Sequence, residues 1–375
     1  MPLYSSSYPN LLGKALRNNI KLQLASKNQK SILLRGEIQT RYQNPNVEFE
    51  LSRFSNTQTS KTIGGRIGVN QELLLPSVRK NKNAISRSKF YLSKAQSNLD
   101  RAVFSYRFAM AYLDYKEALG KERLQKLAIK ISSNIFKIAN QRFKHGSIAK
   151  SEWLQAKLDH SRALRSKDEL KMMSLEAKHR FLSLGNLRLN TYVDTSYKFK
   201  KSYRNSIHPL IKLNQKREEL AYAKLKLASN TIEKISLFSD VENEVNQNIV
   251  RFGISIPLPM SNKKSQEKQL AKIAINTQQM KIQNQRISLK IKIRQIKEEN
   301  RALKRLKSSY YGQIKEQKNL LNMYQKAYSL AQINILKLNS TKQNLLESKV
   351  KLFEAKSKIE RNILKINYLQ GGKNG

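Results

Sequence analysis

The sequence contains no cysteine, little proline and glycine, and no long apolar run. Its 375 residues include no Cys, 7 Pro and 13 Gly. Without cysteine, this form of the chain has no disulfide, no thiolate metal site, no cysteine nucleophile and no lipid-modified cysteine. Because proline and glycine are the residues that most often interrupt helices, their scarcity leaves most of the chain free to be helical.

A recognisable export or membrane signal is also missing. The apolar runs are only a few residues long, far short of the ~20 that a transmembrane helix requires. Residues Met1 to Ser7 show neither the basic n-region nor the apolar h-region of a signal peptide. Read literally, this start predicts a cytoplasmic protein. The other interpretation is a chain whose export signal was cleaved or left out of the gene model, and the sequence leaves both open.

Acidic residues are scarce relative to basic ones. The chain has 72 Lys+Arg against 27 Asp+Glu, a net charge of +45, and the segment from Ser261 to Gly375 alone has 26 Lys/Arg against 7 Asp/Glu. Such an excess can indicate nucleic acid or an anionic membrane as a partner. Here the basic residues are spread singly along the chain without interleaved aromatics, which favours solvated helix faces in a lysine-rich sequence.

Two alternating segments in the first half predict a β-hairpin over residues 46–75. A helix is expected from Leu11 to about Ile38, and Asn44-Pro45-Asn46 follows as a break. Apolar and polar residues then alternate in two runs of about ten residues, the length of a tilted strand that crosses an outer membrane. The polar stretch Ser55–Lys61 is expected to form the turn. The expected water-facing positions are Glu48, Glu50, Arg66 and Glu72, and the expected lipid-facing ones are Val47, Phe49, Ile67 and Val69.

A very long helix is expected over 78–144, where there is no proline and Gly120 is the only glycine. Apolar residues recur every seven positions, a heptad seam typical of closely packed helices; they are Ile85, Leu92, Leu99, Tyr106, Leu113 and Leu127. At ~1.5 Å per residue this helix would be roughly 100 Å long. His145-Gly146-Ser147 then breaks it, and Ser147 is the expected N-cap of a return helix over 147–184.

The same order recurs in residues 191–375. We expect a helix over 209–229, a β-hairpin over 231–257, a long helix over 263–337 and a return helix over 341–369. In the second hairpin the water-facing positions are Asp240, Glu242 and Arg251, and the lipid-facing ones are Phe252 and Ile254. An offset of 192 residues matches Ala139 with Ala331, which places the second break at Leu338-Asn339-Ser340. Residues 1–190 and 191–375 are therefore interpreted as two αββαα repeats.

No group of residues predicts catalysis, metal binding or a cofactor. The four histidines (His145, His160, His179 and His208) are scattered, and no His/Asp/Glu group has the spacing of metal ligands. There is no phosphate-binding Gly-Lys-Ser/Thr loop and no Gly-x-Ser-x-Gly motif. Trp153 is expected to be a packing residue. The sequence predicts a protein that is not an enzyme.

Three segments resemble the outer-membrane efflux channels of the TolC type. They are the first break with Ala139, Phe143, Gly146, Ser147, Leu154, Ala156 and Leu158, the segment Phe252–Pro259, and the segment Gln39–Leu51. The resemblance covers nearly the whole chain, and Ser255-Ile256-Pro257-Leu258-Pro259 is its most specific part. Two positions depart from the family pattern: Asn19 stands where the family often has proline, and Leu338 occupies the glycine position of the second break.

The resemblance implies a mainly α protein with membrane β-strands. Three copies would form a long-helix coiled-coil α-barrel, and each would give four strands to a twelve-stranded barrel in outer-membrane lipid. The physical argument agrees, because four strands cannot close a barrel and open edges are not tolerated in lipid. The implied function is the passive exit duct of a tripartite efflux or type I secretion system. The implied partners are a periplasmic adaptor (membrane fusion) protein and an inner-membrane pump, with no nucleic acid.

The resemblance also implies where functional residues lie. The periplasmic tip that would dock the adaptor comprises His145, Gly146, Ser147, Ile148, Leu338, Asn339, Ser340 and Thr341. The constriction at the tip would be lined by Glu152, Glu347 and Asn344, and the barrel lumen by the seven charged strand residues named above. The alternative is a basic cytoplasmic coiled-coil protein that binds nucleic acid. It accounts for the charge and the missing signal, but not for two hairpins at equivalent places.

Overall fold

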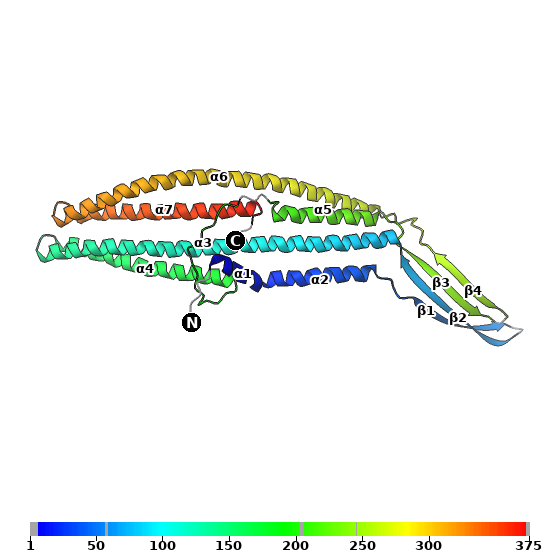
Figure 1. Ribbon diagram of the computed structural model, residues 1–375. Coiled ribbons are helices and arrows are strands. Elements are labelled where there is room, and N and C mark those ends of the chain that lie inside the picture. Colours follow the sequence, from blue (N-terminus) through cyan, green and yellow to red (C-terminus); the bar gives the residue numbers. More distant parts are fainter. Residues whose placement is uncertain (1–6, 57–58, 203–205, 245, 373–375) are drawn as a thin grey trace. The chain divides into compact units, whose positions relative to one another are not determined.

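The computed structural model describes residues 7–56, 59–202, 206–244 and 246–372 (Figure 1). The helices are α1 (Tyr8–Asn18), α2 (Ile20–Thr40), α3 (Pro76–Lys144), α4 (Lys150–Leu184), α5 (Pro209–Ala228), α6 (Ser265–Ser329) and α7 (Ile335–Leu369). The strands are β1 (Asn46–Asn56), β2 (Thr59–Leu74), β3 (Lys234–Asn243) and β4 (Asn248–Ser255). The expected order of helices, hairpin, long helix and return helix is confirmed in both halves.

The chain divides into two compact units, which are described separately. Unit 1 comprises residues 1–22, 100–208 and 287–375, and unit 2 comprises residues 23–99 and 209–286. Within the described residues, no helix combines the length and the apolar character needed to cross a membrane.

Unit 2 contains the sheet, in which the four strands are antiparallel in the order β1-β2-β3-β4. The register pairs Phe49 with Ile67 and Ile67 with Val241, so these apolar residues share one face. The alternate positions share the other face, because successive side chains of a strand point to opposite sides. Large side chains on the apolar face are strongly exposed in the single chain, for example Phe49 at 75% and Phe252 at 79%. The expected alternation is confirmed, but β1 and β2 extend further than expected. Only residues 57–58 separate them, and these lie outside the described part of the chain.

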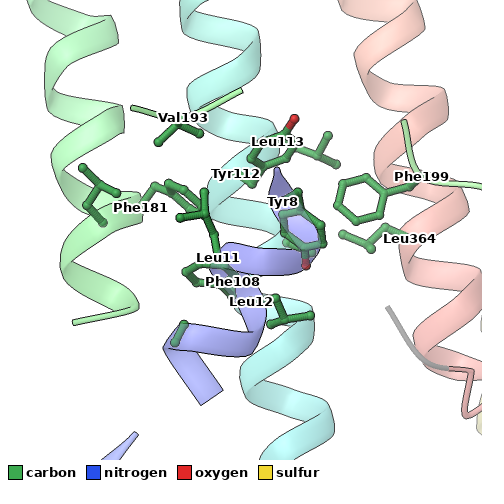
Figure 2. Close-up of a cluster of buried hydrophobic side chains, with 13 residues drawn as sticks. Tyr8, Leu11, Leu12, Phe108, Tyr112, Leu113, Phe181, Val193, Phe199 and Leu364 are labelled. Atoms are coloured by element: carbon green, nitrogen blue, oxygen red, sulfur yellow. The ribbon is translucent and has the colours of Figure 1, made fainter. Parts of the chain in front are cut away.

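Unit 1 is organised by two apolar clusters, one of which surrounds α1. Tyr8 is fully buried, and its ring centroid lies 5.0 Å from that of Tyr112 and 4.9 Å from that of Phe199. Figure 2 shows Tyr8 among these rings, with Phe181 of α4 and Leu364 of α7 nearby. The segment between α4 and α5 is therefore held to the helices by its aromatic residues.

The single helix expected from Leu11 to Ile38 is wrong, since the structure has two helices separated by Asn19. Asn19 is extended, with φ −75° and ψ 106°, and its side-chain oxygen accepts a hydrogen bond from Leu22 N at 3.2 Å. Asparagine is a good N-cap because its side chain can satisfy a free backbone N–H of the first turn. The break therefore forms at the position where the family that the sequence resembles often has proline.

The heptad stripes are confirmed by burial. Every stripe residue of α3 is buried or half-buried, including Ile85 at 9% and Leu113 at 4% exposure. In α6 apolar residues also recur every seven positions in the sequence, and they too are buried or half-buried: Ile275, Ile282, Leu289, Ile296, Leu303 and Tyr310. These faces pack while the lysine-rich faces remain in solvent, as expected for amphipathic helices.

Candidate functional site: the helical tip and the charged face of the sheet

The turn between α3 and α4 is closed by a glycine in the left-handed conformation. Gly146 has φ +67°, and a Cβ at this position would meet no atom within 4 Å. Gly146 N donates to Phe143 O at 3.0 Å, and Ser147 N donates to Arg142 O at 2.8 Å. These bonds satisfy carbonyls that a helix C-terminus leaves without partners. The glycine is therefore favoured by its backbone angles, and lack of space plays no part.

The turn between α6 and α7 repeats this geometry at an offset of 185 residues. Ala331 takes the position of Gly146, with φ +64°. Ala331 N donates to Tyr328 O at 3.2 Å, and Gln332 N donates to Ala327 O at 2.9 Å. The return helices α4 and α7 are both 35 residues long. The two repeats therefore share one turn structure, and the second uses alanine where the first uses glycine.

The expected position of the second turn is wrong by seven residues, one heptad. The match of the two halves at an offset of 192 residues predicted the break at Leu338-Asn339-Ser340 and a long helix that continues to residue 337. In the structure α6 ends at Ser329 and α7 begins at Ile335. A heptad pattern matches itself again after a shift of seven, so periodicity alone cannot distinguish the two registers.

The predicted tip residues of the second repeat therefore lie inside α7. Leu338 is fully buried, Asn339 is 9% and Thr341 is 6% exposed, and Ser340 is exposed. The turn itself comprises residues 330–334, which the sequence analysis missed as tip residues. A signal was present in the sequence: the aromatic, small and isoleucine residues at Phe143, Gly146 and Ile148 recur at Tyr328, Ala331 and Ile333.

The residues that cap the return helices also differ from expectation. Ser147 was expected to cap the first return helix, but α4 begins at Lys150 with Ala149 at its N-cap and no side-chain hydrogen bond. In α7 the N-cap is Asn334, whose side-chain oxygen accepts a hydrogen bond from Lys337 N at 3.1 Å. The side-chain cap is therefore present in the second repeat only.

The two turns belong to one packed tip within unit 1. Buried apolar residues from four helices form its core: Ile135, Ala139, Ala156, Leu321, Tyr328, Ile335, Leu338 and Leu345. Ile148 of the first turn and Ile333 of the second pack against this core. Of the predicted tip residues in the first repeat, His145, Gly146 and Ser147 are exposed. The exposed residues of the first turn therefore lie beside a well-packed core.

Polar contacts join the two repeats at the tip. Arg142 donates to Tyr328 O at 2.9 Å, and its guanidinium lies 4.7 Å from the centre of the Tyr328 ring. Glu152 accepts a hydrogen bond from Ile335 N at 3.0 Å, so its carboxylate sits at the positive end of the α7 helix dipole. Burial, and then the nearby Glu152 carboxylate, raises the pKa of Tyr328 to about 12.

The three predicted constriction residues have different environments. Glu152 is half-buried and contacts α7 as described, whereas Glu347 is exposed and pairs with Lys351 at 2.6 Å. Asn344 is exposed. A nearby ion pair was not predicted from the sequence: Lys342 of α7, whose side chain is 5% exposed, pairs with the half-buried Asp159 of α4. Neither residue stands out in sequence, because both lie in amphipathic helices with many charges.

The structure brings the seven predicted lumen residues together on the polar face of the sheet. Arg66 contacts Asp240 at 3.2 Å, and Arg251 contacts the same carboxylate at 2.9 Å. Arg251 also pairs with Glu242. Glu50 lies 4.0 Å from Arg66, and at the end of the sheet Glu72 pairs with Lys234 at 2.5 Å. Glu48 completes the set at the edge of the sheet.

No group of three or more histidine, aspartate or glutamate side chains within the described ranges is placed to hold a metal ion.

Comparison with solved structures identifies the fold of this chain. The outer membrane protein VceC of Vibrio cholerae superposes with a TM-score of 0.79, covering 98% of this chain and 96% of that chain at 13% identity. The fold is that of the outer-membrane efflux channels. The Campylobacter jejuni CmeC channel has a TM-score of 0.75 at 15% identity, covering 98% of this chain and 86% of that chain. The open state of the Neisseria gonorrhoeae MtrE channel has a TM-score of 0.72 at 14% identity, covering 97% of this chain and 88% of that chain.

This efflux-channel fold confirms the expected fold class, while the identities are too low to establish more than the fold. No protein-family model matches the sequence. No curated protein has a recognisably related sequence.

Proposed function

We propose that this protein is the outer-membrane exit duct of a tripartite efflux or type I secretion system, and that three copies form the channel. The observation that carries the proposal is the sheet, which has one exposed apolar face, one charged face and two free edges at β1 and β4. A sheet of this kind is stable in a bilayer only when its edges are paired, with the apolar face toward lipid and the charged face toward water. Further copies of the same chain supply that closure.

In this proposal the tip is the docking end for a periplasmic adaptor, through which an inner-membrane pump delivers substrates. The exposed residues of the two equivalent turns form the surface: His145, Gly146, Ser147, Leu330, Ala331 and Gln332. Leu330 supports this assignment, because it is an apolar side chain left 68% exposed at the end of a well-packed core. The duct itself is passive and performs no reaction.

The nucleic-acid alternative accounts for the charge of +45 but not for the sheet. A soluble coiled-coil protein would expose Phe49, Leu51 and Phe252 to water at 75, 86 and 79% of their surface. Apolar patches of this kind mark protein or membrane contacts rather than nucleic-acid sites.

The experiment is to express the chain with an export signal, fractionate the membranes and measure the mass of the detergent-solubilised protein by light scattering. Outer-membrane recovery as a trimer supports the proposal, and a folded soluble monomer would refute it. Export with its pump is then compared for Gly146→Val and Gly312→Val. Gly312 is the matched control, since its added Cβ meets nothing within 4 Å and its φ is ordinary. Gly146→Val should abolish export while trimer and barrel persist, and Gly312→Val should export normally.

A further inference from the structure

Unit 2 contains an apolar cavity between α3, α5 and α6, with a volume of about 480 Å³. Its large apolar side chains come from Ile85 of α3, Leu220 and Leu227 of α5, and Leu270 of α6. Cavities that bind small organic molecules usually measure about 300–1,000 Å³ and are lined mainly by apolar side chains, with a few polar groups that fix the orientation of the ligand. This cavity has the size and the character of such a site.

Small side chains on both long walls of the cavity leave its space open. They belong to Ala221 and Ala228 of α5, and to Ala271 and Ala274 of α6. The lining extends from Arg217 to Ala228 on α5 and from Glu267 to Gln278 on α6. At ~1.5 Å per residue, each of these stretches is about 16 Å long. The cavity is therefore elongated, and an unbranched hydrocarbon chain fits this shape better than a compact ring system.

One end of the cavity has polar groups that are free to bind a ligand. Gln279 donates to Glu218 Oε1 at 2.9 Å, which places Arg217 of α5 and Gln278 of α6 at the same end. Arg217 donates to Asn214 Oδ1 at 3.2 Å, but it is in none of the ion pairs found among the described residues. The amide oxygen of Gln278 is buried and accepts no hydrogen bond from the part of the chain that the structure describes.

The charges at the opposite end of the cavity are unfavourable for an anion. Glu233 pairs there with Lys264 and, at 3.5 Å, with Lys82. Glu267, at the same end, is an exposed acid. Because like charges repel and unlike charges attract, an anionic group in the cavity is directed away from Glu267 and toward Arg217.

We propose that this cavity binds a long-chain fatty acid anion, with its carboxylate at Arg217 and Gln278 and its hydrocarbon chain between the alanine-lined walls. A guanidinium group can donate two parallel hydrogen bonds to a carboxylate, and the Gln278 amide, which has two donors as well as its oxygen, can donate a further one. Lys224, an exposed cation of the lining, adds to the attraction. The hydrocarbon chain is stabilised when it leaves water for apolar walls. One copy of the protein forms the whole site, so this proposal does not depend on the proposed channel function.

The test is photocross-linking of the full-length protein in phosphatidylcholine vesicles, with a diazirine-labelled hexadecanoic acid as the probe. Mass spectrometry should locate the cross-links on α5 and α6, at residues that line the cavity. Unlabelled hexadecanoate should compete with the probe. Hexadecanol, which has the same hydrocarbon chain without the carboxylate, should compete about tenfold less well.

Three variants separate the carboxylate site from the cavity itself. Arg217→Ala should reduce labelling about tenfold, because the carboxylate loses its charged partner. Lys212→Ala is the matched control and should be labelled normally, since it removes an exposed cation of the same helix that does not line the cavity. Ala274→Phe fills the cavity and should abolish labelling, while circular dichroism checks that the helices are retained.

Equal labelling of Arg217→Ala and Lys212→Ala would overturn the carboxylate site. Labelling that persists in Ala274→Phe, or that occurs only on the apolar face of the sheet, would overturn the cavity as the place of binding. A trimer that excludes the probe would show that a second copy covers the cavity, and would also overturn the proposal.

Discussion

Gly146 and Ala331 adopt the same left-handed backbone conformation, with φ of 67° and 64°, at positions 185 residues apart. Each ends a long helix and begins the reversal into a return helix of 35 residues. Glycine adopts this conformation without cost, whereas an L-residue such as alanine is destabilised in it by about 1–2 kcal/mol. The second turn therefore stores strain that the first does not, although their hydrogen bonds are the same.

The strain at Ala331 predicts a stabilising substitution. Ala331→Gly should slow hydrogen exchange of the turn amides in the second repeat, with local stability rising by about 1 kcal/mol. Gly146→Ala should have the opposite effect in the first repeat and speed exchange there. Equal and unchanged exchange in both variants would contradict the assignment of left-handed turns.

The partly buried ion pair between Asp159 and Lys342 predicts an asymmetric response to mutation. Lys342→Met leaves the half-buried Asp159 carboxylate without its partner and should lower the free energy of unfolding by about 1–3 kcal/mol. Adding Asp159→Leu removes the orphaned charge and should restore most of that loss. Denaturant unfolding of the two variants checks this, and a double variant no more stable than Lys342→Met alone would argue against a partly buried pair.

The side chain of Glu152 should matter more as a hydrogen-bond acceptor at the start of α7 than as a negative charge. Glu152→Gln retains an oxygen that can accept from Ile335 N, so it should cost little stability. Glu152→Ala removes the acceptor at the start of α7 and should cost about 1 kcal/mol, the usual loss for a helix cap. Hydrogen exchange at the first amides of α7 distinguishes the two variants.

The exposed Glu347 is the opposite case: Glu347→Gln should leave stability unchanged and reduce cation preference in single-channel recordings.

The two faces of the sheet should respond differently to charge. Phe252→Arg places a cation on the apolar face and should destabilise the folded protein in lipid by about 2–4 kcal/mol. Ser52→Arg, on the polar face, should have a much smaller effect. Unfolding from lipid vesicles measures both losses. A larger loss for Ser52→Arg than for Phe252→Arg would show that the faces are assigned the wrong way round, and equal losses would show that they do not differ in environment.

The stability of unit 1 should depend on pH through His208. Burial lowers the pKa of this imidazole below its ordinary value, and its ring packs edge-on at 5.1 Å against Tyr368. The unfolded chain therefore takes up a proton at a higher pH than the folded protein. The stabilisation is complete above about pH 6.5 and is lost as the pH falls below it. His208→Phe should unfold with a weaker dependence on pH in this range, as melting temperatures at about pH 8 and about pH 5.5 can test.

Local periodicity in the sequence was enough to determine the class of fold. Spacing by seven identified the buried stripes of α3 and α6, and alternation identified which strand residues share a face. Both patterns follow from the geometry of one helix or one strand, so they require no knowledge of neighbours. The charged residues of the polar face were found for the same reason, since Asp240 and Arg251 lie on one face in any antiparallel register that preserves the alternation.

Only the tertiary structure decided where the second turn lies and what holds the tip together. A heptad pattern is unchanged by a shift of seven, so Leu338 and Asn339 fitted the turn in sequence although they pack inside α7. Contacts such as Glu152 with Ile335, or Lys342 with Asp159, join residues 183 positions apart. They depend on the rotation and height of one helix against another, which are set by packing in three dimensions and leave no periodic signal in the chain.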